Sequence, residues 1–205
     1  GGFGITYIAM DMMLERVVAI KEFFVQGYMY RDNSTSTSIS VSTSAGDSQE
    51  QYYRLNREKF EREAKIIAHL DDLTGIVKVY DFFYENDTVY MVLEYLDGIN
   101  LKEYVKAQGG KLNVNEVTSK LNSVMSSLQN LHEHGILHRD ISPDNIMVLG
   151  DGSLKLLDFG GAKIQANTGL SNMVIAKKGY TPIEQYHTDG NQGVWTDVYA
   201  MAATI

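Results

Sequence analysis

The sequence predicts an α+β protein in which a strand-rich first part carrying one helix is followed by a helix-rich second part. Short apolar runs bounded by turn residues fill much of the first 96 residues. Apolar residues three and four positions apart mark one helix in the first part and a longer helix in the second. The chain has 205 residues, of which 44% are hydrophobic and 21% charged, so it can bury a sizeable core.

The first part begins with a glycine turn, and we expect strands at 5–10, 17–21, 76–83 and 88–93. A helix is expected over 51–70, because Tyr53, Phe60, Ala64 and Ile67 fall on one of its faces. Residues 31–49 are polar and rich in serine and threonine. This composition predicts a mobile insertion, either a passive loop or a set of autophosphorylation sites.

Residues 94–98 form a predicted linker to the second part. Its main helix is marked by apolar residues at alternating steps of three and four, namely Val114, Val117, Leu121, Val124, Leu128 and Leu131. Gly135 is a natural end for this helix. Apolar runs at 146–149 and 154–157, separated by Gly150-Asp151-Gly152, predict a hairpin.

Composition excludes several classes of protein. The net charge of −8 argues against a nucleic-acid partner, since such proteins are usually basic. Cysteine is absent, which excludes disulfides and thiolate metal sites and fits a reducing compartment. No apolar run reaches the roughly 18 residues of a membrane span, so we expect no membrane contact by this segment.

Both ends of the chain lie inside predicted structure. The first residues belong to a glycine turn, and residues 202–205 belong to a helix without a stop signal. We therefore expect a domain truncated at both ends, with exposed apolar surface near Val198–Ile205.

The segment His138-Arg139-Asp140-Ile141-Ser142-Pro143-Asp144-Asn145, followed by Asp158-Phe159-Gly160, carries the clearest chemical signal. Asp140 provides a carboxylate that can receive or orient a hydroxyl proton. Asn145 and Asp158 provide oxygen ligands suited to Mg²⁺. These are the groups that phosphoryl transfer requires. His138 is expected to pack beneath the loop, and the other histidines show no metal-ligand spacing.

Lys21 ends an apolar strand beyond the glycine turn, where an ammonium could hold phosphates whose oxygens also meet backbone N–H groups of the turn. Glu63 lies among the apolar-face residues of the predicted helix and is a candidate partner for Lys21. Taken singly, Lys21 and Glu63 are more simply interpreted as solvated charges, and the glycines fit an ordinary hairpin turn at least as well.

Over nearly its whole length the chain resembles the eukaryotic-type protein kinases, and the bacterial serine/threonine kinases in particular. The resemblance lies in GGFGITY, VAIKEFF, FEREAKIIAHL, YMVLEYLDG, HGILHRDISPDNIM, LLDFGGAK, GYTPIEQY and WTDVYA. It implies a bilobal fold, with a kinase N-lobe and hinge at 1–96 and an incomplete C-lobe at 97–205. GYTPIEQY and WTDVYA contain Glu184 and Asp197, and they favour a protein substrate over a small molecule.

The resemblance also implies ATP and Mg²⁺ as cofactors and assigns nucleotide contacts. The implied nucleotide-binding residues are Gly1, Gly4, Thr6, Ala19, Lys21, Leu93, Glu94, Leu96 and Met147. Among them Leu93 is the gatekeeper and 94–96 the hinge. Arg139 suggests control by activation-loop phosphorylation, with Thr168 and Ser171 as candidate acceptors. The kinase segment is expected in the cytoplasm, whether or not the parent chain has a membrane anchor.

One position departs from the family pattern. Ser142 stands where the family carries a lysine that neutralises the γ-phosphate, and Lys177 stands where the family carries a threonine. We hypothesise that the two residue types have exchanged places, so that Lys177 supplies the ammonium and Ser142 the hydroxyl. The alternative is that Lys177 is a solvated loop lysine and the site is impaired.

Three functions follow from these observations. The first is an active protein serine/threonine kinase that acts on protein substrates and, in autophosphorylation, on itself. The second is a pseudokinase that binds nucleotide or serves as a signalling scaffold, for which Ser142 is the supporting feature. The third is a kinase for a small molecule, which would phosphorylate a metabolite without autophosphorylation.

Overall fold

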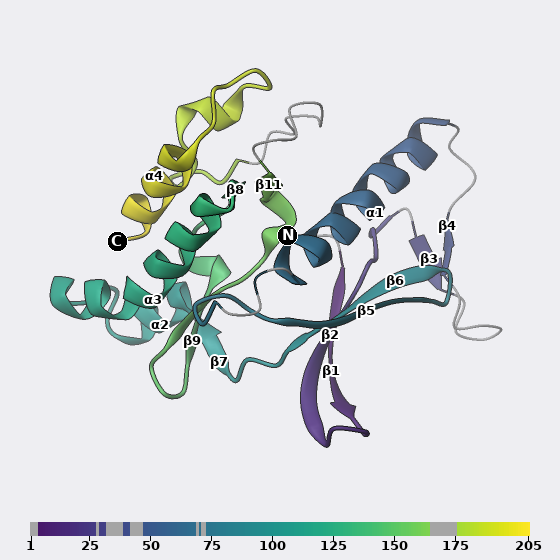
Figure 1. Ribbon diagram of the computed structural model, residues 1–205, viewed down its shortest axis with the longest axis horizontal. Coiled ribbons are helices and arrows are strands. Elements are labelled where there is room, and N and C mark those ends of the chain that lie inside the picture. The colour runs from purple at the N-terminus through teal and green to yellow at the C-terminus, as the bar shows by residue number, and fades with distance from the viewer. Residues whose placement is uncertain are drawn as a thin grey trace. The chain divides into compact units, whose positions relative to one another are not determined.

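The structure is a computed structural model that describes residues 4–27, 29–31, 39–41, 47–68, 70, 73–164 and 176–205. The chain divides into two compact units. The first comprises Gly1–Asp71 and Lys78–Tyr95, and the second comprises Asp72–Val77 and Leu96–Ile205. Strands and one long helix build the first unit, and helices dominate the second (Figure 1). The predicted α+β class is confirmed.

A four-stranded antiparallel sheet forms the framework of the first unit. Its strands are β1 (Ile5–Asp11), β2 (Arg16–Glu22), β5 (Val79–Glu85) and β6 (Thr88–Glu94), in the order β1-β2-β6-β5. Glu85 pairs with Thr88, so β5 and β6 are joined by a two-residue turn, in which Asn86 and Asp87 both have positive φ angles. This hairpin type matches the twist of the flanking strands.

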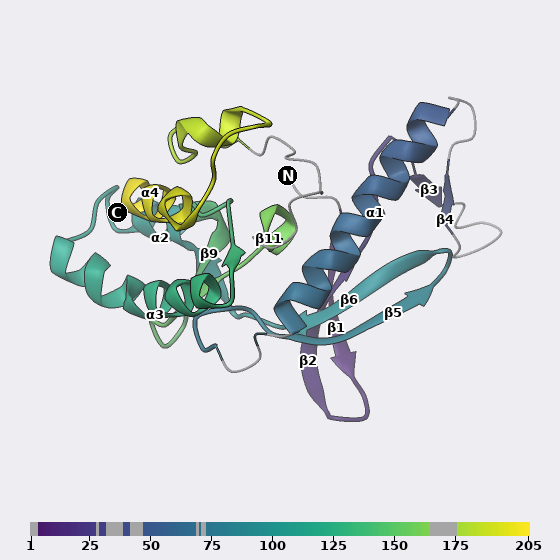
Figure 2. The same cartoon turned by 45° about the horizontal axis from the view of Figure 1, so that its top comes forward.

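Helix α1 (Asp47–Ala68) packs against β5 and β6 (Figure 2). Phe60, Ala64 and Ile67 are buried on the predicted face. The Phe60 ring lies 5.7 Å from the ring of Phe23, which follows β2. A buried apolar stripe thus holds the helix against the sheet.

The prediction of an irregular loop over 31–49 was wrong in part. Strands β3 (Met29–Arg31) and β4 (Ile39–Val41) pair in antiparallel fashion, and α1 already begins at Asp47 rather than at residue 51. Ile39 is buried, as is Met29 just before the stretch, so these strands have apolar anchors that the average composition of 31–49 conceals. Residues 32–38 and 42–46 lie outside the described residues, and their mobility stays a prediction.

The second unit is built on helices α2 (Leu101–Ala107), α3 (Val114–Glu133) and α4 (Val194–Thr204). The predicted helix is α3, which begins after an Asn113 side chain that accepts from Asn115 N. It buries Leu121, Val124, Leu128 and Leu131. Gly135 follows its end with a φ of 69°, a left-handed conformation that glycine adopts readily.

Small sheets and short 3₁₀ helices complete this unit. The sheets are β7 (Gly98–Asn100), β9 (Ile146–Leu149) and β10 (Leu154–Leu156) in the order β10-β9-β7, and β8 (Ile136–Leu137) with β11 (Lys163–Ile164). The 3₁₀ helices are η2 (Pro143–Asn145), η3 (Phe159–Gly161) and η4 (Ile183–Tyr186). The predicted hairpin is formed by β9 and β10.

Ile76 does not begin a strand of the first unit, as the sequence had suggested. It bridges to Leu156 in β10, and Val77 N donates to the Leu156 carbonyl at 3.1 Å. The Gly75 carbonyl accepts from Leu156 N at 2.8 Å. These hydrogen bonds draw residues 75–77 into the second unit, and the strand β5 begins only at Val79.

Helix α4 carries exposed apolar side chains, as predicted for residues 198–205. Val198, Tyr199 and Ile205 are 57%, 53% and 56% exposed. Within the described residues, no helix is both long enough and apolar enough to span a membrane.

Candidate active site

A buried aspartate at the start of α4 holds the catalytic-loop segment from below. Asp197 accepts hydrogen bonds from His138 N at 2.8 Å and from Arg139 N at 2.7 Å. Its Oδ2 also lies 2.9 Å from Nε2 of His132, a partner that sequence spacing did not reveal. Because Asp197 is fully buried, its bonds to the two amides fix the backbone that leads into Asp140, while the His132 ring holds the carboxylate itself.

The loop backbone is strained at this point. Arg139 has a φ of 66°, which is costly for a residue with a β-carbon, and its carbonyl accepts from Gln185 Nε2 at 2.9 Å. The buried ring of His138 lies edge-on to Phe159, with centroids 4.7 Å apart. His138 therefore has the packing position that the sequence suggested.

Asp140 is held by Asn145. The Asn145 amide nitrogen donates to the Asp140 carbonyl at 2.8 Å and to its carboxylate Oδ2 at 2.9 Å. Burial raises the pKa of Asp140 above its ordinary value, and the nearby carboxylate of Asp158 adds to this effect. His138, the Asn145 hydrogen bond and the Lys177 ammonium act in the opposite direction. The carboxylate is thus oriented and partly desolvated.

The β9–β10 hairpin brings the two candidate metal ligands to one end. Ile146 pairs with Leu156, and Leu157 N donates to the Asn145 carbonyl at 2.8 Å. Asp158 follows at once, in a left-handed conformation with a φ of 55°. Its Oδ1 accepts from Gly160 N at 3.2 Å. Asn145 and Asp158 therefore lie on adjacent stretches of chain, although 12 other residues separate them in sequence.

Lys177 and Ser142 meet in the structure. The Lys177 Nζ donates to the Ser142 Oγ at 2.8 Å, and Ser142 is fully buried. The ammonium does not bond to Asp140 within the described part of the chain, yet its charge lowers the pKa of that carboxyl. An ammonium therefore lies beside Ser142, the position at which this chain lacks the lysine of the family.

Asp144 is a member of this cluster that sequence reasoning missed. Its Oδ2 lies 2.6 Å from Lys177 Nζ, and its Oδ1 lies 3.2 Å from Lys102 Nζ. The pKa of Asp144 is lowered, above all by the hydrogen bond from Lys177; burial opposes this, and the hydrogen bond from Lys102 lowers the pKa further. The sequence drew attention to Asp144 only through its place in the motif, between Pro143 and Asn145. That place did not identify Lys177 as its partner.

In the first unit, Lys21 and Glu63 form a buried ion pair. The Lys21 Nζ lies 2.8 Å from Glu63 Oε1, and the side chains are 17% and 6% exposed. Strand β2 supplies the lysine and helix α1 the glutamate. The Lys21 ammonium also lies 5.7 Å from the centre of the Phe60 ring. The predicted partner of Lys21 is thus in contact with it.

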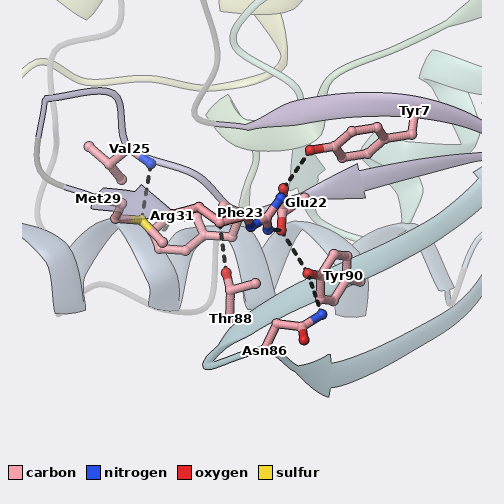
Figure 3. Close-up of polar contacts among 9 residues, drawn as sticks. All are labelled: Tyr7, Glu22, Phe23, Val25, Met29, Arg31, Asn86, Thr88 and Tyr90. Atoms are coloured by element: carbon pink, nitrogen blue, oxygen red, sulfur yellow. Dashed lines mark hydrogen bonds and ion pairs between the residues drawn. The ribbon is translucent and has the colours of Figure 1, made fainter. Parts of the chain in front are cut away.

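The residue after Lys21 is the centre of an unpredicted polar cluster (Figure 3). Glu22 is fully buried and accepts from Tyr7 Oη at 2.9 Å and from Tyr90 Oη at 2.7 Å. Arg31 of β3 forms an ion pair with the same carboxylate. Burial opposes the charge of Arg31, but its hydrogen bonds with Tyr7 and Glu22 outweigh burial and raise its pKa. The cluster joins β1, β2, β3 and β6.

The residues assigned to the nucleotide base and glycine turn fall in both units. Gly4 has a φ of 149°, and a β-carbon there would meet the Glu22 carbonyl oxygen at 2.6 Å. Thr6 pairs with Lys21, and Ala19 pairs with Leu93 next to Glu94. Leu96 begins the longer segment of the second unit, whose strand β9 carries Met147. Gly1, Thr168 and Ser171 lie outside the described residues.

The segment around Glu184 is hydrogen-bonded to α4. The Thr196 hydroxyl donates to Glu184 Oε1 at 2.9 Å. A β-carbon at Gly190 would lie 1.9 Å from the Glu184 carbonyl oxygen. The backbone at Gly190 therefore approaches the backbone at Glu184 so closely that only glycine fits. The described residues contain no cluster of three or more His, Asp or Glu side chains placed to hold a metal.

Comparison with known proteins identifies the class. The family model described as "Protein kinase domain" matches residues 1–205, so the chain belongs to the protein kinase family. Its relatives are bacterial serine/threonine kinases. The chain is 31% identical over 207 residues to the serine/threonine-protein kinase PrkC of Bacillus subtilis, and 31% identical over 206 residues to a probable kinase, PknB, of Lactococcus lactis.

These matches cover 100% and 98% of the chain but 28% of each relative, so the chain spans less than a third of their length. A solved structure described as "PpkA-294 apo form" superposes with a TM-score of 0.82 at 34% identity, covering 100% of the chain and 70% of that structure. The bilobal kinase fold expected from the sequence is confirmed.

Proposed function

We propose that this domain transfers the γ-phosphoryl group of Mg-ATP to serine or threonine hydroxyls of proteins. The observation that carries the proposal is the hydrogen bond between Lys177 Nζ and Ser142 Oγ. It supplies an ammonium to a catalytic loop in which every other expected polar group is present. The serine/threonine kinases among its relatives support the same activity.

Asp140 is the group that receives or orients the proton of the attacking hydroxyl. Of the two hydrogen bonds from Asn145, one goes to the Asp140 carbonyl and one to carboxylate Oδ2. The other carboxylate oxygen, Oδ1, is left for the attacking hydroxyl. Because phosphoryl transfer has a loose transition state, positioning of the hydroxyl contributes more than strong basicity. The partly buried carboxylate suits that task.

Asn145 and Asp158 would hold Mg²⁺. The fit rests on their chemistry and placement, since both offer hard oxygen ligands and lie at one end of the β9–β10 hairpin. The Asn145 amide nitrogen faces Asp140, which leaves its oxygen for a cation. Two protein ligands are enough, because Mg²⁺ in such sites keeps water and phosphate oxygens. When bound, the ion would neutralise charge on the phosphates.

The first unit would hold the phosphates of the nucleotide. Lys21, fixed by Glu63, is a cation for the α- and β-phosphates, and the backbone of the turn at Gly1 and Gly4 would contact phosphate oxygens. The remaining nucleotide contacts are proposed at Thr6, Ala19, Leu93, Glu94, Leu96 and Met147. The tight approach of Gly4 to the Glu22 carbonyl supports a turn that lies flat against the strand.

Lys177 would neutralise negative charge on the transferred phosphoryl group in place of the missing lysine. Its Nζ is bound to the loop that carries Asp140, and its charge reaches that carboxyl. A lysine is a point charge on a flexible stem, so the direction from which it arrives matters less than it would for arginine.

Arg139 is the proposed receiver of an activation-loop phosphate. The guanidinium is buried, its pKa is lowered by burial despite Asp197, and its Nε has no hydrogen-bond partner among the described residues. A phosphate on Thr168 or Ser171 would supply a strong acceptor. Protein substrates, autophosphorylation among them, and a cytoplasmic location of this segment are part of the same proposal.

The test is phosphate incorporation from radiolabelled ATP into a generic protein substrate by the full-length protein that contains this domain. Asp140→Asn and Asp158→Asn are the loss-of-function controls. We expect incorporation in the wild type and a loss of about a hundredfold or more in each variant. Binding of Mg-ATP without incorporation in the wild type would instead support a pseudokinase, and phosphorylation of a metabolite alone would support a small-molecule kinase.

A further inference from the structure

The Lys177 ammonium is held by two groups that flank a proline in the catalytic loop. Ser142 Oγ lies 2.8 Å from Nζ on one side of Pro143, and Asp144 Oδ2 lies 2.6 Å from it on the other. An ammonium has three donors, so these two contacts leave the third for another acceptor. The position of the charge is therefore defined by two points on one short segment.

Both ends of the Lys177–Asp144 contact are rigid. The Lys177 amide donates to Thr181 Oγ1 at 2.7 Å, and its carbonyl accepts from Tyr180 N at 3.0 Å. Asp144 is the middle residue of η2, whose turn is closed by a hydrogen bond from Asn145 N to the Ser142 carbonyl at 3.0 Å. The backbone is thus held at both residues, and the position of the ammonium depends on the side-chain contacts.

A lysine side chain loses about 2 kcal/mol of rotamer entropy when it is held in one position. A neutral hydroxyl is a modest anchor for such a chain, and Ser142 alone would leave Nζ free to swing. A charged acceptor makes a shorter and roughly twofold stronger hydrogen bond. The carboxylate of Asp144 is thus the principal anchor, and Ser142 sets the direction.

We propose that Asp144 is a positioning residue for Lys177 in the transfer reaction. The inference rests on the proposed function, because it assumes that Lys177 assists transfer. Lys102 engages the second oxygen of Asp144 from a side chain that is 69% exposed, and such a contact contributes little on its own. With both oxygens engaged by ammonium groups, Asp144 acts through Lys177 and not on the acceptor protein.

The kinetic test uses the full-length protein with a generic acceptor protein, and compares kcat with the KM for ATP. Asp144→Asn keeps the shape and removes the charge, Asp144→Glu restores the charge, and Lys102→Met is the matched control. We expect kcat to fall between about tenfold and a hundredfold in Asp144→Asn, because a misplaced group loses that much. Asp144→Glu recovers a large part, and Lys102→Met changes kcat less than about twofold.

The double variant Asp144→Asn/Lys177→Met separates the mechanisms. If Asp144 acts through Lys177, the double variant is no slower than Lys177→Met alone. An equal further loss in that background overturns the inference, as does an Asp144→Asn variant with unchanged or increased kcat. A loss confined to the KM of acceptors with basic residues overturns it as well, because Asp144 would then contact the substrate.

A second measurement does not depend on activity. Acylation of Lys177 by a lysine-specific reagent, followed by mass spectrometry, is expected to accelerate severalfold in Asp144→Asn, because the side chain is no longer held by a carboxylate and is more open to the reagent. Lys178, exposed and adjacent, is the internal control. Unchanged acylation shows that Asp144 does not anchor Lys177. If the wild type is inactive but acylation is faster in Asp144→Asn than in the wild type, Asp144 does anchor Lys177 and the proposed function fails.

Discussion

Asp197 accepts the backbone N–H of Arg139 at 2.7 Å and thereby holds the residue before Asp140 in a conformation with positive φ. The same carboxylate holds His138 N at 2.8 Å. A residue of helix α4 therefore maintains strain in a loop that lies more than 50 positions earlier in the sequence. Strain of this kind persists where the surroundings over-determine it.

Removal of this carboxylate is expected to release the loop. Asp197→Ala leaves the two buried amides without acceptors, at about 1–3 kcal/mol each. Thermal unfolding should occur at a lower temperature, by about 2–4 °C for each kcal/mol in a chain of this size. The exposed Asp189→Ala is the matched control. If the two variants melt together, the loop does not depend on Asp197.

The ion pair between Lys21 and Glu63 predicts a coupled loss of activity. Either Lys21→Met or Glu63→Gln should reduce kcat/KM by about a hundredfold, since each displaces the cation meant for the phosphates. The double variant should lose little more than Lys21→Met alone. Glu58→Gln, exposed on the same helix, should behave as the wild type. Additive losses would show that Glu63 acts independently of Lys21.

The electrostatic reach of Lys177 can be measured in magnesium-free protein. Burial raises the pKa of Asp140, and the Lys177 ammonium partly offsets that rise. Lys177→Met removes a positive charge that favours the carboxylate, so the pKa of Asp140 should rise further. Carbon-13 NMR titration of the carboxyl measures this value, and Lys178→Met should leave it unchanged. A lower pKa of Asp140 in Lys177→Met would contradict the inferred effect of the Lys177 charge.

The cluster around Glu22 predicts an effect on stability. Tyr90→Phe removes a 2.7 Å hydrogen bond to a fully buried carboxylate, and a bond to a charged group contributes about 1.5–3 kcal/mol. The exposed Tyr84→Phe is the control. Urea unfolding of both variants measures the difference. Equal stability would mean that Tyr7 and Arg31 satisfy Glu22 without Tyr90.

Local patterns were enough to predict much of the architecture. The spacing of Leu121, Val124 and Leu128 predicted α3, because a helix repeats every 3.6 residues and buries one face. The pairing of Lys21 with Glu63 was inferable because Glu63 falls among buried positions of α1, where a charge needs a partner. The resemblance to kinases supplied the hypothesis that positions 142 and 177 exchange roles, which stays a prediction.

Contacts between distant segments could not be predicted in the same way. Arg31 opens a stretch whose composition suggests a loop, and only the fold brings it to Glu22. Ile76 continues an apolar run, but its backbone finds a partner in β10. Asp144 was visible in the motif, yet its partner in the ion pair is Lys177, which lies 33 residues away. Local spacing in the sequence does not reveal which distant residue each of these three contacts.

The exchange of Ser142 and Lys177 is the central claim, and a reversal of the exchange tests it most directly. Phosphate incorporation is measured for Lys177→Thr, Ser142→Lys and the double variant of the full-length protein. The account predicts a loss of about a hundredfold or more in Lys177→Thr. Ser142→Lys alone should also be impaired, since it buries a second ammonium beside Lys177. The double variant should recover most of the activity. Full activity in Lys177→Thr, or a double variant no better than Lys177→Thr, would contradict the account.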